Sequence, residues 1–528
     1  TTKLKEVIEV KGVASAVDVR KTTVSVSISK EMIQSLPTSR NPWSVLNLVP
    51  GMMVDREDVG GNESGQQSSF YGNGGSADDV TWNVDGANIT DPSAIGAAPG
   101  YLNVNSYEEL QVTVGSNDIT AQTGGTQLNF VTKRGGNNYS GDFHLYVEDE
   151  AWEMTQTLPQ NMIDNGLESP GIFRLYQYGI NFGGPIVKDK VWFFGSWGIQ
   201  DIHSKTIAQT EDSTWLVSGY GKLNFQLGNT AGDFTYTYDA KKKWGRAAYG
   251  AASQSTGSTW DQDGPGSVTN ASLQHVMGNL MLNVKFAYTD GGFSLTPKAG
   301  ELVDGLLTGP DMVRYSKPLF YLDGNMYYYG TDRNSTNISL SGNYFAEGVM
   351  GGDHEIRFGV DYYTADTETF RYFPNQRTLT QYDRGDPTSD KEIWWTTNGI
   401  EALGFKRTSF YLSDTATFGK LTATFGIRYD KEQGSHNETT VPGISFNGTP
   451  IFTEYMGDLT ISGRDIPAAF EVISPRLSFT YDISGNGKNV VKVSLARYGG
   501  QSGQTLTDHT WTAWNREIDV VWNDNGNG

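Results

Sequence analysis

The 528-residue sequence contains no cysteine, which excludes disulfides, thiolate metal sites and cysteine catalysis and is compatible with an oxidising compartment. No apolar run approaches the roughly 20 residues of a membrane-spanning helix. No signal peptide is visible in the chain, which begins at Thr1. Basic residues are also scarce, because 40 Lys and Arg face 60 Asp and Glu. The net charge of −20 argues against a nucleic-acid partner, since no basic surface is in surplus to neutralise phosphate.

Aromatic residues and glycine are abundant in this sequence. It contains 27 Tyr, 24 Phe, 13 Trp and 63 Gly. Aromatic girdles, polar lumens and acidic loops are typical of outer-membrane β-barrels. A large soluble β-protein is the alternative that composition leaves open.

Residues 1 to about 137 differ from the rest of the chain, because they are rich in Asn, Gly, Ser and Asp and poor in long alternating strands. Segment 29–51 predicts two short helices, broken by Pro37 and Pro50. Strands are predicted at 80–86, 106–115 and 126–136. We therefore expect a compact α+β domain over residues 13–137, preceded by a short segment, residues 1–12.

From residue 138 to 528 the chain alternates apolar and polar residues. In KLTATFGIRYD (420–430), Phe425 and Ile427 lie on one face of a strand, and Thr424 and Arg428 lie on the other. This pattern predicts a mainly β domain. The thirteen predicted strands are at about 139–151, 173–183, 190–201, 217–227, 233–243, 270–277, 280–290, 335–346, 353–366, 406–418, 420–431, 472–483 and 490–500.

The predicted connections alternate between short and long. Short turns such as Gly278–Asn279 follow the even strands, and long loops such as 291–334 follow the odd ones. This alternation is typical of a transmembrane antiparallel β-barrel with short periplasmic turns and long outer loops. Thirteen is an odd number, whereas single-chain bacterial barrels have even numbers of strands. We therefore expect a partial barrel that lacks C-terminal strands, with a complete open β-protein as the alternative.

An ordered set of segments resembles the TonB-dependent outer-membrane receptors, specifically the Oar-like branch. The segments are MIQSLPTSRNPWSVLNLVPGM (32–52), TWNVDGANITDP (81–92), SYEELQVTVGSNDITAQTGGTQLNFVTKRGGNNYSGDF (106–143), GGPIVKDKVWFFGSW (183–197), HEIRFGVDY (354–362) and SPRLSFTYDISGNGKNVVKVSLARY (474–498). The resemblance implies a 22-stranded barrel filled by an N-terminal plug, in the bacterial outer membrane. Many Oar-like proteins also carry a small β-domain before the plug, and this chain begins too late to contain one.

The resemblance also implies a partner in the periplasm. EVIEVKG (6–12) resembles a TonB box, the strand that such receptors offer to the edge of a TonB sheet. The expected TonB-binding residues are Glu6, Val7, Ile8, Glu9 and Val10. An ordinary edge strand of the plug is the alternative interpretation.

Four charged residues are candidates for plug–barrel pairing, because charges buried inside a barrel need partners. They are Arg40 and Arg134 in the plug and Asp361 and Asp430 in the barrel. The acids could equally face water in the lumen.

Ligand contacts are expected at the plug apex and the outer loops. The candidates are Gln66, Gln67, Phe70, Tyr71, Asn73, Asp91, Tyr101, Trp244, Trp260, Trp394 and Trp395. The tryptophans are also typical of membrane girdles or loop packing.

Calcium is a candidate ion in the acidic loops 55–63 and 523–528, although neither matches the DxDxDG pattern. No other metal site and no cofactor is expected. An enzyme is not expected either, because HExxH and GxSxG are both absent from the sequence.

The sequence thus predicts a TonB-dependent transporter that imports a large or complex ligand, such as an oligosaccharide, a peptide or a chelate. The expected partners are the TonB complex, outer-membrane lipid, the extracellular ligand and a surface lipoprotein or other envelope protein. The alternatives are a non-transporting surface adhesin and a secreted β-rich glycan hydrolase.

Overall fold

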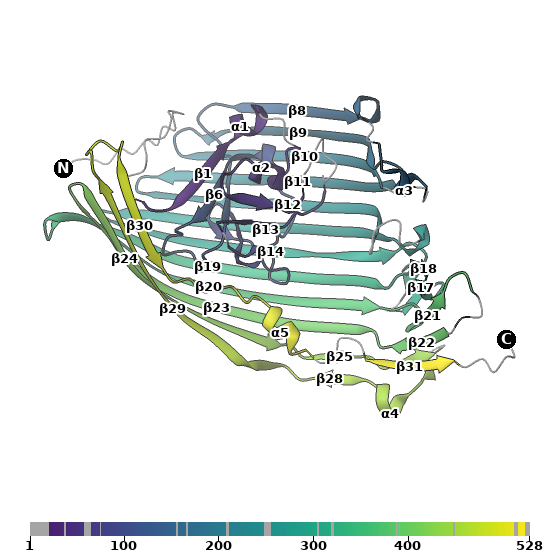
Figure 1. Cartoon of the computed structure of the whole chain (residues 1–528). Helices are drawn as coiled ribbons and strands as arrows, with labels where there is room; N and C mark the ends of the chain where they lie inside the picture. The colour runs from purple at the N-terminus through teal and green to yellow at the C-terminus, as the bar shows by residue number, and fades with distance from the viewer. Residues whose placement is uncertain are drawn as a thin grey trace.

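The computed structural model describes residues 21–35, 39–56, 65–73, 75–154, 157–164, 167–206, 211–247, 255–303, 306–317, 321–386, 389, 391–446, 449–511 and 516–522. A large, open and curved antiparallel sheet carries a small α+β domain against its concave face (Figure 1). None of the helices in this described part has the length and apolarity that a membrane-crossing helix needs.

The N-terminal domain is built on a five-stranded sheet of order β1-β6-β7-β4-β5. Its strands are β1 (Val24–Ser29), β4 (Thr81–Val84), β5 (Ala87–Asn88), β6 (Tyr107–Gly115) and β7 (Gln127–Thr132). Two short helices, α1 (Lys30–Ser35) and α2 (Pro42–Leu46), and the ribbon of β2 (Met52–Val54) and β3 (Phe70–Gly72) complete it. Asn41 caps α2, since its side chain accepts a hydrogen bond from the Ser44 N–H at 2.8 Å. The helices and strands predicted for this region are therefore present.

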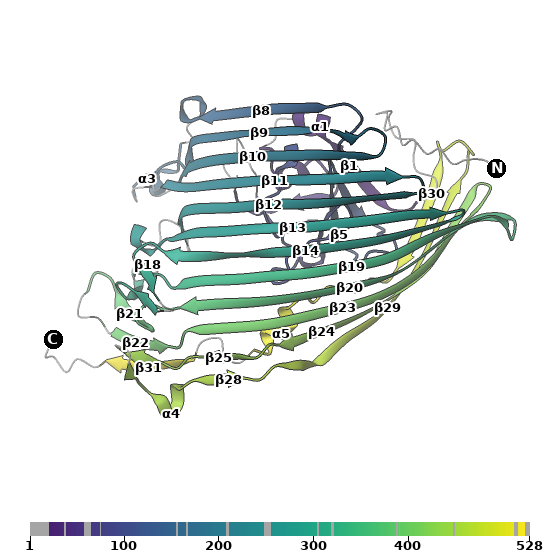
Figure 2. The same ribbon diagram turned by 180° about the vertical axis from the view of Figure 1, so that it is seen from behind.

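All thirteen predicted strands of the large sheet are present and pair in chain order. They are β8 (Ser140–Asp149), β9 (Gly171–Val187), β10 (Val191–Lys205), β11 (Glu211–Leu227), β12 (Thr230–Arg246), β13 (Trp260–Met277), β14 (Leu280–Pro297), β19 (Tyr328–Val349), β20 (Gly352–Tyr372), β23 (Gly399–Phe418), β24 (Leu421–His436), β29 (Arg464–Asp482) and β30 (Val490–Ala496). Seen from behind, these strands run side by side across the convex face (Figure 2). The first and last, β8 and β30, form the two sides of the sheet.

The two faces of this sheet differ as the alternation predicts. On β12, Thr235 and Thr237 point inward and are fully buried, whereas Phe234 and Tyr236 point outward and are about half exposed. On β24, Phe425 and Ile427 are likewise exposed while Arg428 and Asp430 are buried. Apolar side chains therefore cover the convex face, as a lipid-facing wall requires, and polar side chains cover the concave face.

Several strands extend beyond their predicted outer ends. β13 begins at Trp260 rather than near residue 270, because Gly264, Pro265 and Gly266 continue the pairing with β12. These three residues interrupt the ladder with β14, which resumes at Ser267. Pro265 has no backbone N–H to donate, which is consistent with the loss of pairing on one of the two sides of β13.

The long outer loops are partly folded. A second five-stranded sheet lies beyond the ends of the barrel strands, at the right of Figure 1, in the order β18-β17-β21-β22-β31. Its members are β17 (Met312–Lys317), β18 (Tyr321–Gly324), β21 (Arg377–Asp383), β22 (Lys391–Thr396) and β31 (Glu517–Trp522). Smaller elements in the outer connections are β15 (Glu301–Val303), β16 (Leu306–Thr308), β25 (Thr439–Val441), β26 (Ser445–Phe446), β27 (Thr449–Pro450), β28 (Leu459–Ile461), α3 (Gln160–Ile163) and α4 (Thr453–Met456).

The chain leaves the large sheet after Ala496, although the sequence predicts that the last strand continues to residue 500. The next residues cross the concave side, where α5 (Thr505–His509) lies (Figure 1). Gln501 donates to the backbone oxygens of Asp78 and Val80, and Gln504 donates to that of Leu403. This segment therefore bridges the N-terminal domain and the barrel wall.

Candidate functional site

The N-terminal domain is organised around Trp82, a fully buried residue of β4. The rings of Trp43, Phe70 and Phe130 lie 5.7–5.9 Å from it, centroid to centroid. The indole N–H of Trp82 donates to the Gly96 oxygen at 2.9 Å. This aromatic core thereby fixes the loop that follows β5, which faces the barrel wall.

The first contact with the wall is the turn between β4 and β5. Asp85 and Gly86 have φ values of 50° and 76°, the left-handed region that suits a tight hairpin turn. The Asp85 carboxylate accepts from Lys222 of β11 at 2.9 Å, and its backbone oxygen accepts from Lys285 of β14 at 3.0 Å. Two barrel lysines therefore hold one plug turn.

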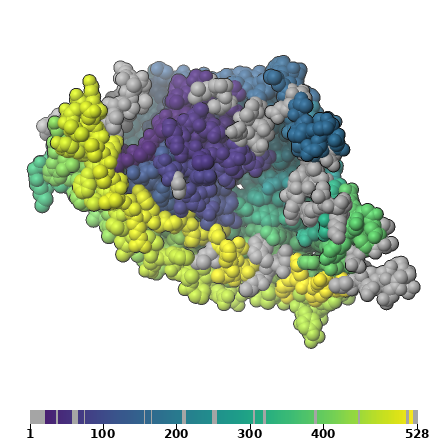
Figure 3. All heavy atoms as spheres, viewed as in Figure 1, coloured from purple at the N-terminus to yellow at the C-terminus, as the bar shows by residue number. Residues whose placement is uncertain are grey.

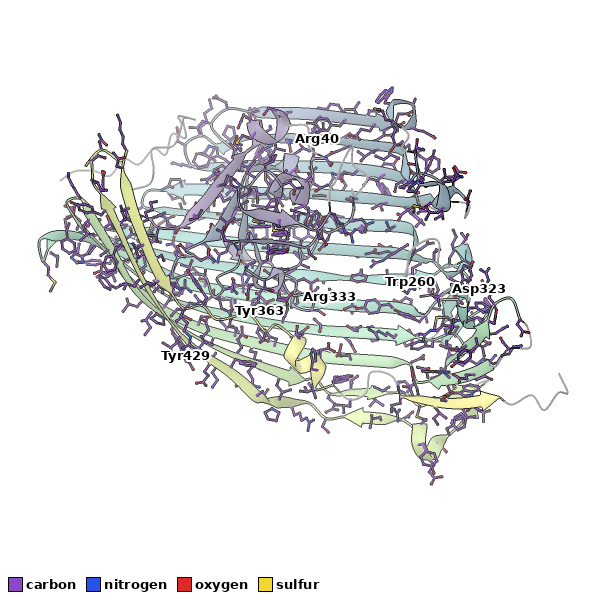
Figure 4. All side chains as sticks on the ribbon, in the orientation of Figure 1. Arg40, Trp260, Asp323, Arg333, Tyr363 and Tyr429 are labelled. Atoms are coloured by element: carbon purple, nitrogen blue, oxygen red, sulfur yellow. The ribbon has the colours of Figure 1, made fainter. Side chains whose placement is uncertain are left out.

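The second contact is an ion pair farther along the same loop. Asp91 and Arg333 of β19 lie 2.7 Å apart, and both side chains are nearly buried. Arg333 lies on the concave side of the sheet (Figure 4). The other oxygen of Asp91 accepts from the N–H groups of Ser93 and Ala94, each at 2.8 Å. Every oxygen of this carboxylate therefore has a partner, as a buried charge requires.

The third contact is the loop between β6 and β7. Three arginines of neighbouring strands, Arg407 of β23, Arg428 of β24 and Arg476 of β29, donate to it. A cavity of about 1800 Å³ lies beside this contact, between the N-terminal domain and the β13–β30 part of the wall. In the space-filling view the N-terminal domain fills much of the concave side (Figure 3).

Two family models match this chain. The TonB-dependent Receptor Plug Domain matches residues 18–128, and the Outer membrane beta barrel domain matches residues 131–216. Together with the thirteen-stranded sheet, these matches support a TonB-dependent receptor. Its place is the bacterial outer membrane.

Known proteins support this assignment. The TonB-dependent transporter Oar of Myxococcus xanthus is 28% identical over 198 residues, which are 36% of this chain and 18% of that protein. The outer-membrane transporter YddB of Escherichia coli superposes with a TM-score of 0.69 at 13% identity, over 94% of this chain and 63% of that one. The ferripyoverdine receptor of Pseudomonas aeruginosa superposes with a TM-score of 0.59 at 15% identity, over 90% of this chain and 57% of that one. The receptor thus spans less than two thirds of the length of these relatives.

The predicted ligand residues of the plug lie in different environments. Gln67 is partly buried and donates to the Ala98 oxygen at 3.1 Å, and Asn73 donates to the Val114 oxygen at 2.9 Å. Tyr71 is exposed on β3, and Gln66 is partly buried. Phe70 is only 2% exposed and packs on Trp82, so its ring belongs to the plug core and not to an open apex.

Two further predicted ligand residues take part in plug–barrel contacts. Asp91 forms the ion pair with Arg333 described above. Tyr101 packs against Trp43 with its ring tilted, and it accepts a hydrogen bond from Lys241 of β12 at 2.8 Å. Burial raises the pKa of Tyr101 to about 12, although nearby cations oppose the shift. The phenol is therefore neutral at physiological pH. Ligand binding by these residues stays a prediction.

The four tryptophans proposed as ligand contacts occupy three separate places. Trp244 is exposed on the convex face of β12, which places it outside the lumen. Trp260 is buried and donates to the Tyr327 oxygen at 2.7 Å, so it is a packing residue of the outer region (Figure 4). Trp394 and Trp395 lie together on β22 of the outer sheet. Both are partly buried there, and ligand binding by any of the four stays a prediction.

The four residues predicted to pair plug and barrel do not meet one another. The Arg40 guanidinium lies 3.6 Å from the ring centre of Tyr146 on β8, which is a plug–barrel contact of another kind. Arg134 is exposed beside a second cavity of about 520 Å³. Asp361 accepts from Asn337 at 2.5 Å. Asp430 lies 2.7 Å from Arg428, an arginine of its own strand.

Two sets of predicted residues fall mostly outside the described part of the receptor. The TonB-box residues Glu6 to Val10 lie entirely outside it, and so does the acidic segment 523–528. Of the loop 55–63, only Asp55 and Arg56 are described. Within the described ranges, no group of three His, Asp or Glu side chains could hold a metal ion.

Sequence reasoning missed the basic residues of the inner wall. Lys222, Lys285, Arg333, Arg407, Arg428 and Arg476 all contact the plug. The signal that could have found them is a lone cation on the polar face of an alternating strand. Half of the acceptors in these contacts are backbone oxygens, which leave no signal in the sequence.

Proposed function

We propose that this receptor imports a large or complex hydrophilic ligand across the outer membrane, with energy delivered by TonB. The observation that carries this proposal is the plug bonded at three places to the polar concave face of the sheet. In a closed barrel a plug held in this way blocks diffusion, so passage requires work on the plug. The outer membrane has no nucleotide energy source of its own, which makes an inner-membrane partner necessary.

The position of the N-terminal segment supports coupling through residues 6–10. Lys21, the first described residue, accepts through its backbone oxygen from Lys492 of β30 at 2.6 Å. Lys492 lies a few residues from the short connection between β29 and β30. Because the short connections mark the periplasmic side, Lys21 lies on that side, and we propose residues 6–10 as the segment that a periplasmic partner binds. A segment of this kind binds by adding a strand to the partner's sheet.

The relatives indicate the breadth of ligands such a fold accommodates. One is a receptor bound to ferripyoverdine, and another is a ferric citrate transporter. For this chain we propose an oligosaccharide, a peptide or a chelate, received between the outer sheet and the plug.

Uptake by whole cells tests this proposal. Cells that express the chain are given labelled maltoheptaose, a labelled hexapeptide or ferric citrate, beside cells that express a variant lacking residues 6–10. We expect uptake of at least one compound above the empty-cell background and its loss in the deletion variant, with equal amounts of both proteins in the outer membrane. Uptake that survives the deletion contradicts TonB coupling. Binding at the cell surface without uptake supports an adhesin instead.

A further inference from the structure

The loop between β6 and β7 of the plug is held by the barrel wall along residues 118–122. Arg476 donates to the backbone oxygens of Asp118 and Ala121. Arg428 donates to the oxygens of Ile119 and Thr120, at 3.4 and 2.8 Å. Arg407 donates to the side-chain oxygen of Gln122 at 2.6 Å. Every acceptor that the plug offers to these three cations is therefore a neutral amide oxygen.

The three arginines lie on neighbouring strands of the sheet, and each is displaced by a few residues along the strand direction from the one before. Arg476 of β29 is opposite Gly426 of β24, Arg428 follows two residues later on β24, and Arg407 of β23 is opposite Glu432. Since alternate residues share a face, all of these positions point into the lumen. The arginines thus form a diagonal that follows one stretch of plug backbone.

Arg428 differs from the other two in its charge partner. Its guanidinium lies 2.7 Å from the Asp430 carboxylate. Arg407 and Arg476 are only 6% and 7% exposed, yet neither forms an ion pair with a carboxylate in the described part of the chain. The Nε atom of each also lacks a hydrogen-bond partner there. Buried cations without a carboxylate are unusual, because burial of a charge is costly unless it is paired.

The nearby acids are engaged elsewhere. Glu432 is directly opposite Arg407, but the Gln122 amide lies between them and donates to Glu432 at 2.6 Å. The second oxygen of Glu432 accepts from Ser502. Asp118 pairs with Arg357 at 3.4 Å. Tyr363 and Tyr498 place their rings 5.1 and 4.4 Å from Arg407 and Arg476, which adds aromatic contacts but no negative charge.

This arrangement faces open space. Arg407, Arg428 and Arg476 all line the cavity of about 1800 Å³, as do plug residues 116–122. Ser413, Thr424 and Ser478 of the wall line the same cavity. The same cavity borders the short connections of the wall at Gly278, Asn279 and Asp353, so a hydrophilic ligand on its way to the periplasm passes these guanidiniums.

We propose that Arg407 and Arg476 form a binding site for a carboxylate or phosphate group of the imported ligand, which replaces plug residues 118–122 as their acceptor. An anionic oxygen accepts hydrogen bonds about twice as strongly as a neutral carbonyl. A ligand bound here therefore competes with the plug loop and favours its release from the wall. The inference deepens the import function proposed above, because it assigns the ligand a negatively charged group.

The release step is tested with a spin label on the loop of the purified full chain. The absence of cysteine makes Thr120→Cys the sole labelling site, and Thr120 is exposed. The probes are sodium citrate and sodium phosphate, with sodium chloride at matched ionic strength as the control. We expect a saturable rise in label mobility with citrate, phosphate or both. A response to citrate alone identifies a carboxylate site, and a response to phosphate alone identifies a phosphate site. Equal responses to the chloride control overturn the proposal.

Calorimetric titration with the same effective probe tests the residues. Arg407→Gln and Arg476→Gln are each expected to weaken binding about tenfold or more, the size of one hydrogen bond to a charged group. Lys492→Gln is the matched control, because Lys492 lines the same cavity away from the loop, and its affinity should not change. Arg476→Lys covers the case in which the glutamine variants fail to fold, and it should still weaken binding because a fork of donors is lost.

Unchanged affinity in the arginine variants, or an equal loss in Lys492→Gln, contradicts the assignment. The titration contains no TonB, so its outcome is independent of the uptake experiment. Binding without TonB-dependent uptake would leave the anion site in place and remove the import function. Uptake without anion binding would support the import function and remove the anion site.

Discussion

At the residue scale, buried charges connect the plug to the wall. Asp91 and Arg333 are nearly buried and pair at 2.7 Å, while Lys222 serves both Asp85 at 2.9 Å and Asp233 at 3.7 Å. Loss of one partner from such a pair leaves an uncompensated charge in a low-dielectric environment. Single substitutions should therefore be more damaging than matched double substitutions.

The Asp91–Arg333 pair gives the clearest case. Asp91→Asn and Arg333→Met should each lower the free energy of unfolding by about 3 kcal/mol, whereas the double variant should lose less than the sum. Asparagine keeps the oxygen that accepts from Ser93 and Ala94, so the loop itself is preserved. Urea unfolding of the four proteins in detergent measures this coupling. Strictly additive losses would show that the two charges do not interact.

Lys133, which follows β7 in the plug, should make stability depend on pH. Burial lowers its pKa to about 8, and the nearby Lys30 cation contributes to the shift. Because its folded-state pKa is below the unfolded value of 10.5, the unfolded chain binds more protons between these two pH values. Stability should therefore rise as pH increases from about 8 to 10.5. Lys133→Met should remove that rise, as urea unfolding at several pH values would show. Parallel pH profiles of both proteins would contradict this assignment.

At the scale of elements, each barrel strand has a lipid face and a lumen face. Ile427 and Thr424 lie on the same strand, β24, three residues apart and on opposite faces. Ile427 is half exposed on the apolar convex face, and Thr424 lines the luminal cavity. The same new charge should therefore have very different consequences at the two positions.

Ile427→Lys should destabilise the folded barrel by about 2–4 kcal/mol, because it places a charge against lipid. Thr424→Lys is the matched control and should cost much less, since its ammonium group can reach water in the cavity. Urea titration in lipid vesicles, followed by the heat-dependent gel mobility of the folded form, measures both. Equal destabilisation would contradict the assignment of faces.

The thirteen strands could be predicted because period-two alternation is local, and residues 420–430 carry it without interruption. Their outer ends could not be predicted, since both faces become polar there and Gly264–Pro265–Gly266 resembles a loop. The outer sheet was missed for a different reason. Its strand β22 pairs with β31, more than a hundred residues later, and β17 pairs in parallel with β21. Such pairings leave no local periodic signal.

At the scale of the whole molecule, the structure combines a lipid-facing wall, a polar lumen and a plug bonded to that lumen. The architecture and the outer-membrane location could be predicted from ordered motifs together with strand alternation. The anchoring cations could not, because their partners are backbone and side-chain oxygens of the plug whose position depends on the complete fold. Asp430 illustrates this limit, since its nearest cation is Arg428 of the same strand and not a plug arginine.

The central claim is that TonB drives this receptor through residues 6–10. Surface plasmon resonance between the full chain in detergent and the purified periplasmic domain of TonB tests it most directly. Ile8→Pro should weaken binding at least about tenfold, because proline removes a backbone donor from the added strand, whereas Ile8→Val should bind like the parent. Equal binding by all three proteins, or no binding by the parent chain, would contradict the account.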